Sequence, residues 1–401
     1  MTKEPSQPSR RRWRGVAVAA SAVVLLGGGY ATANAATQND TGKRTTAARP
    51  QIRNATGVGR VVNAANAFVD TLTTAQQAEV LLDFSQANAI TWSNLPEGIV
   101  TRPGVQFSTL SDEQLAAAKA VVQAAMGTGK GTGFDQATQI LQADDVLAAA
   151  ESTTTSADPT ASATPTDVPT GTPPSGGPGG PGGGFNYGSG VYFLAFLGTP
   201  STTGTWQLHF GGHHLAVNIT FANGKVTGST PFFIGVEPTS FTTDGTTYQP
   251  LSIMRDGMAK LTGSLTAAQQ AEAKLSQSFG DVLLGPGQDG QFPATKVGIP
   301  VSKLSPKQKK LVLAAIHPWV AAVDDATATM LMKAYEKDLN KTFVAYSGGL
   351  DLATQGDYVR IDGPGVWIEF ISQNGIVFQD QIHFHTVYRD HTRDYGGEFT
   401  F

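Results

Sequence analysis

Six of the seven histidines of this chain lie in two short segments whose sequence predicts β-strands. The first segment, 207–218, contains His209, His213 and His214, and the second, 381–391, contains His383, His385 and His391. Imidazole is the commonest metal ligand in proteins and the side chain that titrates nearest to neutral pH. Such a concentration favours a metal or acid–base site over isolated structural histidines. Because the two segments are far apart in sequence, only the fold can bring them together.

Strand geometry decides which of these histidines can bind one ion. Successive side chains of a strand point to opposite faces, so His383 and His385 share a face. His213 and His214 are adjacent and diverge unless Gly211–Gly212 allows a bulge. His209 precedes the glycines and is the weaker candidate. The predicted ligands of one iron, copper, manganese or zinc ion are therefore His213, His214, His383 and His385.

Two further side chains are expected to take part in the chemistry. Glu369 lies within an apolar strand and would serve as a ligand or general base. A two-residue turn at 374–375 places Glu369 on the face opposite His383, whereas a three-residue loop reverses this. Arg389 follows the histidine pair and would bind an anionic substrate in bidentate fashion. His317 precedes Pro318 in a predicted helix and is expected to be structural.

Composition excludes several classes of protein and of site. The chain has no cysteine, which excludes disulfides, thiolate nucleophiles and iron–sulfur clusters, so a metal must be held by nitrogen and oxygen. Removal of residues 1–35 would take away five basic residues and one acidic residue, leaving 23 basic and 31 acidic residues. A chain of this charge lacks the basic patches that nucleic acids require, so we expect no nucleic-acid partner.

The first 35 residues have the order of an export signal. Basic residues, including Arg10–Arg12, precede a weakly apolar segment at 16–29 and the small residues Ala31, Ala33 and Ala35. The arginines followed by Trp13 are compatible with a twin-arginine signal, and a general secretory signal is equally compatible. The apolar segment is shorter than the ~20 residues of a spanning helix, so we expect no stable membrane span after cleavage. The predicted location is secreted or at the exterior of the cell envelope.

Patterning along the chain predicts one α+β domain interrupted by an insertion. Residues 36–57 are predicted to be a disordered tail, and 58–151 a helical part of the main domain. The segment 152–190 is rich in Thr, Pro and Gly and is predicted to be a flexible insertion. Residues 191–401 are predicted to form an antiparallel β portion with further helices and two hairpins at Asn223–Gly224 and Asn374–Gly375.

A capping motif occurs twice on each side of the predicted insertion. The motif Leu-Ser/Thr-x-x-Gln places a hydroxyl and a Gln so that each satisfies a backbone amide at the start of a helix. Its four copies begin at Leu72, Leu110, Leu265 and Leu304, with nearly equal spacing within each half. We interpret the recurrence as convergent helix capping rather than common ancestry, and the matching spacing as support for one integrated fold.

The histidine motifs also carry a family resemblance. The Gly-Gly-His-His-Leu segment ending at Leu215, the His-x-His-Thr segment from His383 with the following Arg389, and Asp394-Tyr-Gly resemble domain of unknown function 3500. The resemblance covers about residues 60–401 apart from the insertion. It implies an uncharacterised family of bacteria and fungi, brings no known activity, and singles out His213, His214, His383, His385 and Arg389.

The leading hypothesis from sequence is an exported metal-dependent enzyme that acts on a small molecule. Oxidation by a redox metal and hydrolysis by metal-activated water both remain open. A non-catalytic metal- or ligand-binding protein is a second hypothesis, and it predicts a closed coordination shell. A third hypothesis is metal-free acid–base catalysis by His383 or His385. The sequence determines neither substrate nor oligomeric state.

Overall fold

The computed structural model describes residues 49, 51, 55–155 and 186–401. These residues belong to one compact unit, 48–401, with an α+β architecture. The predicted export signal, most of the predicted tail and most of the predicted insertion lie outside the described residues. Within the described part of the chain, no helix is both long enough and apolar enough to cross a bilayer.

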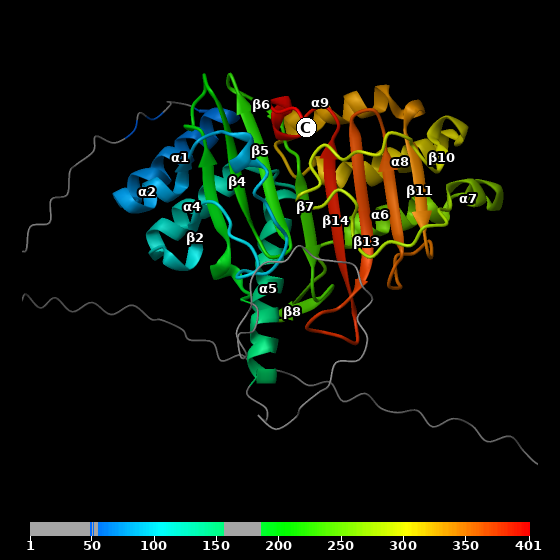
Figure 1. Ribbon diagram of the computed structural model, residues 1–401, viewed down its shortest axis with the longest axis horizontal. Helices are drawn as coiled ribbons and strands as arrows, with labels where there is room; N and C mark the ends of the chain where they lie inside the picture. The colour runs from blue at the N-terminus through cyan, green and yellow to red at the C-terminus, as the bar shows by residue number, and fades with distance from the viewer. Residues whose placement is uncertain (1–48, 50, 52–54, 156–185) are drawn as a thin grey trace, which may run out of the picture. The chain divides into compact units, whose positions relative to one another are not determined.

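One mixed sheet of twelve strands forms the centre of the described unit (Figure 1). Its main path runs β1-β3-β4-β5-β7-β14-β13-β12-β11-β10, with β2 beside β3 and β6 beside β5. The strands of the first part are β1 (Leu81–Leu82), β2 (Val105–Gln106), β3 (Phe193–Leu197), β4 (Thr205–Gly212), β5 (Leu215–Ala222), β6 (Lys225–Gly228) and β7 (Phe232–Val236). Those of the second part are β10 (Ile299–Pro300), β11 (Phe343–Ser347), β12 (Tyr358–Asp362), β13 (Val366–Asn374) and β14 (Ile382–Asp390). A separate hairpin consists of β8 (Phe241–Thr243) and β9 (Thr246–Tyr248).

Helices pack against one face of the sheet, which we call the helix face. They are α1 (Val58–Thr71), α2 (Thr74–Val80), α4 (Asp112–Ala125), α5 (Gly133–Thr155), α6 (Ser252–Gly263), α7 (Ala267–Ala273), α8 (Pro306–Val320) and α9 (Asp325–Lys337). Their apolar residues, such as Phe68 and Trp319, share a core with strand residues of one parity, including Leu208 and Phe384. Burial of this continuous core supplies the stability of a chain that has no disulfides.

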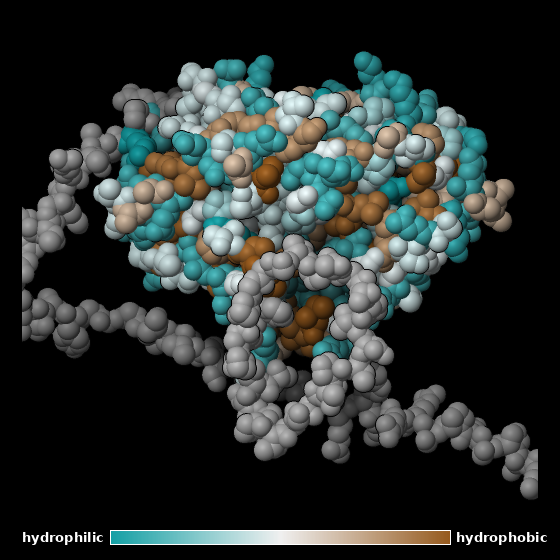
Figure 2. Space-filling model, viewed as in Figure 1, coloured by the Kyte–Doolittle hydropathy of each residue, from teal (hydrophilic) through white to brown (hydrophobic). Residues whose placement is uncertain are grey.

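Irregular segments cover the opposite face, which we call the loop face. Trp92, from the segment after the short helix α3 (Gln86–Ala89), and Tyr395 pack there against Ala216, Phe233 and Val387. The segment 274–298 crosses the same face in front of β13 and β14 (Figure 1). Where it is visible, the surface on this side shows small hydrophobic patches separated by hydrophilic residues (Figure 2). The side chains of His383, His385 and Arg389 all project from this face, as predicted for residues at every second position of a strand.

The predicted helices are largely confirmed, with two differences. All four predicted capping boxes form, at the starts of α2, α4, α7 and α8. Helix α6 was not anticipated from the sequence. The apolar segment 89–92 lies within the part predicted to be helical, but only its first residue belongs to a helix, because α3, which Ser85 caps, ends at Ala89. Its Trp92 is buried by packing against the sheet rather than by pairing within it.

The two halves of the unit repeat the same order of elements. In each half, two helices, a short strand (β2 or β10) and two more helices precede a three-stranded meander, which is β3–β5 in the first half and β11–β13 in the second; the first half contains β1 and α3 in addition. Gln114 Nε2 donates to the Thr71 carbonyl at 2.9 Å, and Gln308 Nε2 donates to the Ser264 carbonyl at 2.8 Å. The two halves therefore correspond not only in their capping boxes but also in the packing of the capped helices and in the register of the strands.

The two predicted Asn-Gly hairpins have different outcomes. Asn223–Gly224 forms the two-residue turn between β5 and β6, with positive φ at both residues. At the second position, seven residues (375–381) separate β13 from β14, so the predicted two-residue turn is wrong. Val366 pairs with Asp390 and Glu369 with Val387. This odd loop length places Glu369 on the loop face, the same face as His383.

Candidate metal centre

Three of the predicted histidine ligands converge at one end of the central strands. His383 and His385 lie at the start of β14, and His214 lies at the tip of the β4–β5 hairpin. One potential ligand atom from each lies within 4.8 Å of the others, and all three residues are buried. We call these three residues the histidine cluster. His213 is not part of this group, although the sequence predicted it as a fourth ligand.

The imidazoles of His383 and His385 present unprotonated nitrogens to one another. His383 Nδ1 lies 2.6 Å from the Asn374 carbonyl, and His385 Nδ1 lies 3.0 Å from Asp281 Oδ1. Both partners are acceptors, so in the neutral rings each Nδ1 carries the proton and each Nε2 carries a lone pair. The two Nε2 atoms face each other at 3.3 Å. Two lone pairs in this arrangement are stabilised by a cation between them.

The geometry of this pair fits a bound transition metal. Nitrogen ligands at about 2.0–2.1 Å from a tetrahedral ion are separated by about 3.3–3.4 Å, which matches the Nε2–Nε2 distance of 3.3 Å. Hydrogen bonds from Nδ1 to a carboxylate and to a carbonyl are the usual outer contacts of metal-binding histidines. The donor set and its hydrogen bonds therefore fit a metal ion.

Burial and neighbouring histidines disfavour the charged forms of His214 and His383. Burial, followed by the neighbouring His385, lowers the pKa of His383 to about 3. Burial and the three neighbouring histidines hold the pKa of His214 well below its ordinary value. At neutral pH these rings are consequently available as metal ligands, since metal binding requires neutral imidazole.

His214 owes its position to a turn and to a glycine. His213 and His214 form the two-residue tip between β4 and β5, and His214 has a φ of 59°. The strand bulge expected from Gly211–Gly212 is absent here; Gly212 instead allows the Tyr192 ring to lie against the backbone. Gly235 plays the corresponding part on β7, because a Cβ there would lie 2.9 Å from both His214 Cδ2 and His385 Cδ2.

His213 is held beside the cluster by the helix face. Its Nδ1 lies 2.5 Å from Oδ1 of Asp144 on α5, and its ring stacks on that of His214 with centroids 3.7 Å apart. The ring of Tyr187 lies 4.8 Å from that of His213. In the neutral ring, the contact with Asp144 places the proton on Nδ1 and leaves Nε2 of His213 with a lone pair next to the cluster.

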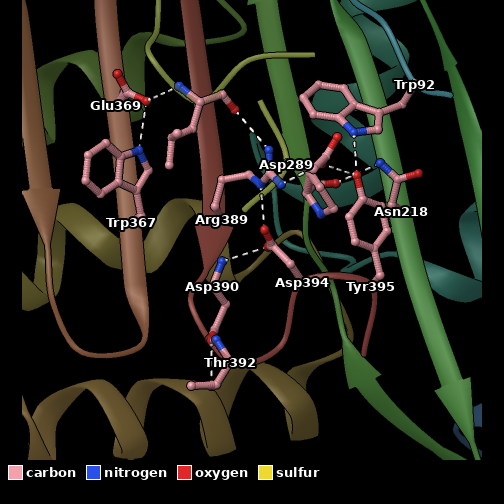
Figure 3. A network of polar contacts seen from close by, with 12 residues as sticks. Trp92, Asn218, Asp289, Trp367, Glu369, Arg389, Asp390, Thr392, Asp394 and Tyr395 are labelled. Carbon is pink, nitrogen blue, oxygen red and sulfur yellow. Dashed lines mark hydrogen bonds and ion pairs between the residues drawn. The ribbon is translucent and has the colours of Figure 1, made fainter. Parts of the chain in front are cut away.

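Asp281 reaches His385 because the segment 274–298 is fastened to the sheet. Glu369, fully buried, accepts hydrogen bonds from the backbone amides of Leu283 and Leu284 at 2.6 and 2.9 Å. It also accepts from Tyr358 Oη and Trp367 Nε1 at 2.7 and 2.8 Å. Burial raises the pKa of Glu369, although these four donors act in the opposite direction. Glu369 thus shares the face of the histidines but holds the segment that carries Asp281 (Figure 3).

Arg389 lies in a second buried network at the other end of β14. Its Nε donates to Asp394 and its Nη2 to Asp289, both at 2.7 Å, and its Nη1 donates to the Leu284 carbonyl at 3.1 Å (Figure 3). Tyr395 Oη also donates to Asp289 at 2.5 Å. All three guanidinium nitrogens are occupied and the side chain is fully buried. This arrangement gives no support to the expected role of Arg389 as a substrate anchor and makes it a residue that joins the loop-face segments.

The other histidines lie outside the cluster. His209 is buried on the loop face of β4, and His391 lies 3.3 Å from Asp362 beyond the end of β14. His317 is exposed on α8 and borders a cavity of about 460 Å³ whose lining includes Lys333. That cavity contains no residue of the histidine cluster.

Sequence reasoning missed the residues that support the cluster. Asp144 and Asp281 lie in a helix and in an irregular segment far from the histidines in sequence, and neither belongs to a recognisable motif. Gly235 follows a run of apolar strand residues, and only its position opposite His385 reveals its role. A glycine within an otherwise bulky strand was the one signal available, because it often marks a close approach.

Comparison with known proteins identifies the family. The family model described as "Protein of unknown function (DUF3500)" matches residues 54–397, which is most of the chain. The chain therefore belongs to the DUF3500 family, as the histidine motifs and the terminal Asp-Tyr-Gly predicted. Neither the curated proteins nor the solved structures include a match to it.

Proposed function

We propose that this member of the DUF3500 family is a metal-dependent enzyme with a mononuclear site formed by His214, His383 and His385. The observation that carries the proposal is the pair of lone-pair nitrogens of His383 and His385, 3.3 Å apart, with both Nδ1 protons engaged elsewhere. Iron, copper, manganese and zinc all accept imidazole ligands. When bound, the ion would supply a Lewis acid for hydrolysis or a redox centre for oxidation.

Three protein ligands favour a catalytic over a structural ion. Structural zinc sites use four protein ligands, whereas catalytic sites commonly use three and keep one position open. His213 adds a proton acceptor at Nε2, oriented by Asp144 at its other nitrogen. Asp281 orients His385 through Nδ1. The proposed substrate is a small molecule, and the proposed export of the protein is supported by the signal-like order of residues 1–35.

Metal analysis of the full chain tests the site. We expect about one iron, copper, manganese or zinc ion per chain, and we expect it to be lost in a His383→Ala/His385→Ala variant. A His317→Ala/His391→Ala variant removes two imidazoles outside the cluster and should retain the metal. The absence of stoichiometric metal, before and after reconstitution with each of the four ions, would contradict the proposal. The identity of the metal chooses between oxidative and hydrolytic assays.

One observation favours a second function, metal binding without catalysis. The exposed fractions of His214 and His383 are only 4 % and 2 %, and the cavity of about 460 Å³ lies elsewhere. Cobalt substitution followed by azide titration separates the two functions. A shift of the cobalt absorption bands with azide shows an open coordination position and supports an enzyme. Unchanged bands show a closed shell and support storage or structural binding.

A further inference from the structure

A buried arginine near the histidine cluster has no counterion among the residues that the structure describes. Arg102 lies in the segment between α3 and β2, and its exposed fraction is 6 %. Its Nη2 donates to the backbone carbonyls of Ser93, at 3.2 Å, and of Leu95. Its Nε and Nη1 are buried and have no hydrogen-bond partner within the described part of the chain. Since guanidinium carries five N–H donors, most of the hydrogen-bonding capacity of Arg102 is unused.

The charge of Arg102 is uncompensated at contact distance. Among the described residues it forms no ion pair, whereas Arg389 contacts both Asp289 and Asp394 at 2.7 Å. Burial lowers the pKa of Arg102, although the more distant Tyr192, Glu97 and Asp144 favour its charged form. An unpaired buried charge is unfavourable. An anion in contact with Arg102 would therefore stabilise the fold.

The strands beneath Arg102 present further unpartnered polar atoms. His209 Nδ1 on β4 and Asn218 Oδ1 on β5 are buried without partners, and these two residues are paired across the strands. The backbone two residues after Arg102 abuts β3, since a Cβ at Gly104 would lie 2.3 Å from the Leu194 carbonyl oxygen. β3 in turn pairs with β4 at Ala195 and His209. Arg102 and His209 thus border the same covered part of the loop face.

We propose that Arg102 is the binding residue for a small carboxylate, held between the 90–104 segment and β3–β5. The position adjoins the histidine cluster, because Asn94, which lies between the two residues whose carbonyls Arg102 contacts, accepts a hydrogen bond from His214 N at 3.0 Å. The further assignment of this carboxylate to the substrate rests on the proposed function. Arg102 then has the anchoring role that the sequence led us to expect of Arg389, and its charge-assisted hydrogen bonds favour an anion over water.

Thermal unfolding of the full chain in formate, chloride or inorganic phosphate at constant ionic strength tests this site. We expect formate to raise the midpoint saturably, by roughly 3–5 °C at 100 times its Kd. The shift should disappear in Arg102→Gln and persist in Arg102→Lys, which keeps the charge. It should also persist in Arg255→Gln, the matched control, because Arg255 is exposed and pairs with its neighbour Asp256.

The outcomes separate this site from the metal site. Formate titration of chelator-treated wild-type protein by calorimetry requires neither a variant nor a metal. Saturable binding there supports the anion site even if metal analysis fails. An equal response to chloride, a response unchanged in Arg102→Gln, or no response to any of the three anions would overturn the carboxylate site while leaving the metal proposal intact.

Discussion

The β4–β5 and β12–β13 hairpins share strand register and tip length but differ in tip conformation and in chemistry, since His214 has a positive φ and Gly365 does not. Each has a two-residue tip, and four positions before the tip a cross-strand pair faces the loop face: His209 with Asn218 in the first and Arg360 with Glu369 in the second. The tips are His213–His214 and Pro364–Gly365. The shared register therefore fixes where side chains project, while different residues on the two hairpins provide a candidate metal ligand in one half and an anchor for a covering segment in the other.

The largest expected effect concerns the Arg389 network, which lies at the other end of β14 from the histidine cluster. Arg389→Met should lower the free energy of unfolding by about 3–5 kcal/mol, because it leaves Asp289 and Asp394 buried without their cation. Urea unfolding monitored by tryptophan fluorescence measures the change. Arg255→Met is the control and should change stability by less than about 0.5 kcal/mol. An Arg389→Met protein as stable as wild type would contradict the structural role given to this side chain.

The second prediction concerns a variant in which the tip of the β4–β5 hairpin carries the glycine found in the tip of the β12–β13 hairpin. His214→Gly places glycine where the other tip has Gly365, and should weaken metal binding by more than about 100-fold, since a first ligand counts for more than an outer contact. Glycine suits the φ of 59°, so the metal-free variant should be as stable as wild type or more stable, by up to about 1 kcal/mol. Metal competition with a chromophoric chelator measures the affinity, and urea unfolding measures the stability. Unchanged affinity would remove His214 from the site.

The smallest predicted effect tests the paired positions below the tips. Burial, with Arg102 nearby, lowers the pKa of His209 from 6.5 to about 4. The folded state therefore binds this proton less readily than the unfolded state. Above pH 6.5 His209 does not lower the free energy of unfolding, because it is neutral in both states. As the pH falls from 6.5 towards 4, protonation of His209 in the unfolded state lowers the free energy of unfolding progressively.

A His209→Gln variant isolates this contribution. The loss of unfolding free energy between pH 7.5 and pH 4.5 should be about 2–3 kcal/mol smaller in the variant than in wild type. Chemical unfolding at the two pH values gives the comparison, and His391→Gln, at a more exposed site, is the control. Equal pH dependence of wild type and His209→Gln would show that His209 is not held neutral by burial.

Local patterns predicted most of the elements and all three histidines of the cluster. Alternation along β14 placed His383 and His385 on one face, and hydroxyl and Gln spacing located four helix starts, because both depend only on neighbouring residues. The tip at His213–His214 was not predicted, since the sequence offers no Asn-Gly signal there and the positive φ falls on a histidine. The face of the sheet on which Glu369 lies depends on the length of the loop between β13 and β14. The Asn374–Gly375 pair predicted that length incorrectly.

What remained hidden depends on contacts between segments distant in sequence. The sequence around Arg389 and around Arg102 does not reveal which carboxylates, if any, each side chain contacts. Only the folded chain shows that one contacts two carboxylates and the other contacts none. Asp281 likewise meets His385 only because Glu369 and Arg389 fasten the segment that carries it. Such pairings are set by tertiary packing, which strand and helix periodicities do not encode.

The position of the cluster has a mechanical consequence for a chain without cysteine. An ion shared by His214 and His383 would join the two halves on either side of β7 and act as a cross-link that closes a loop of about 170 residues. By the relation used for disulfides, closing such a loop removes about 5 kcal/mol of chain entropy from the unfolded state. Metal loading would then determine how long the protein resists proteolysis, and a chelator would act on it as a reducing agent acts on a disulfide-bonded protein.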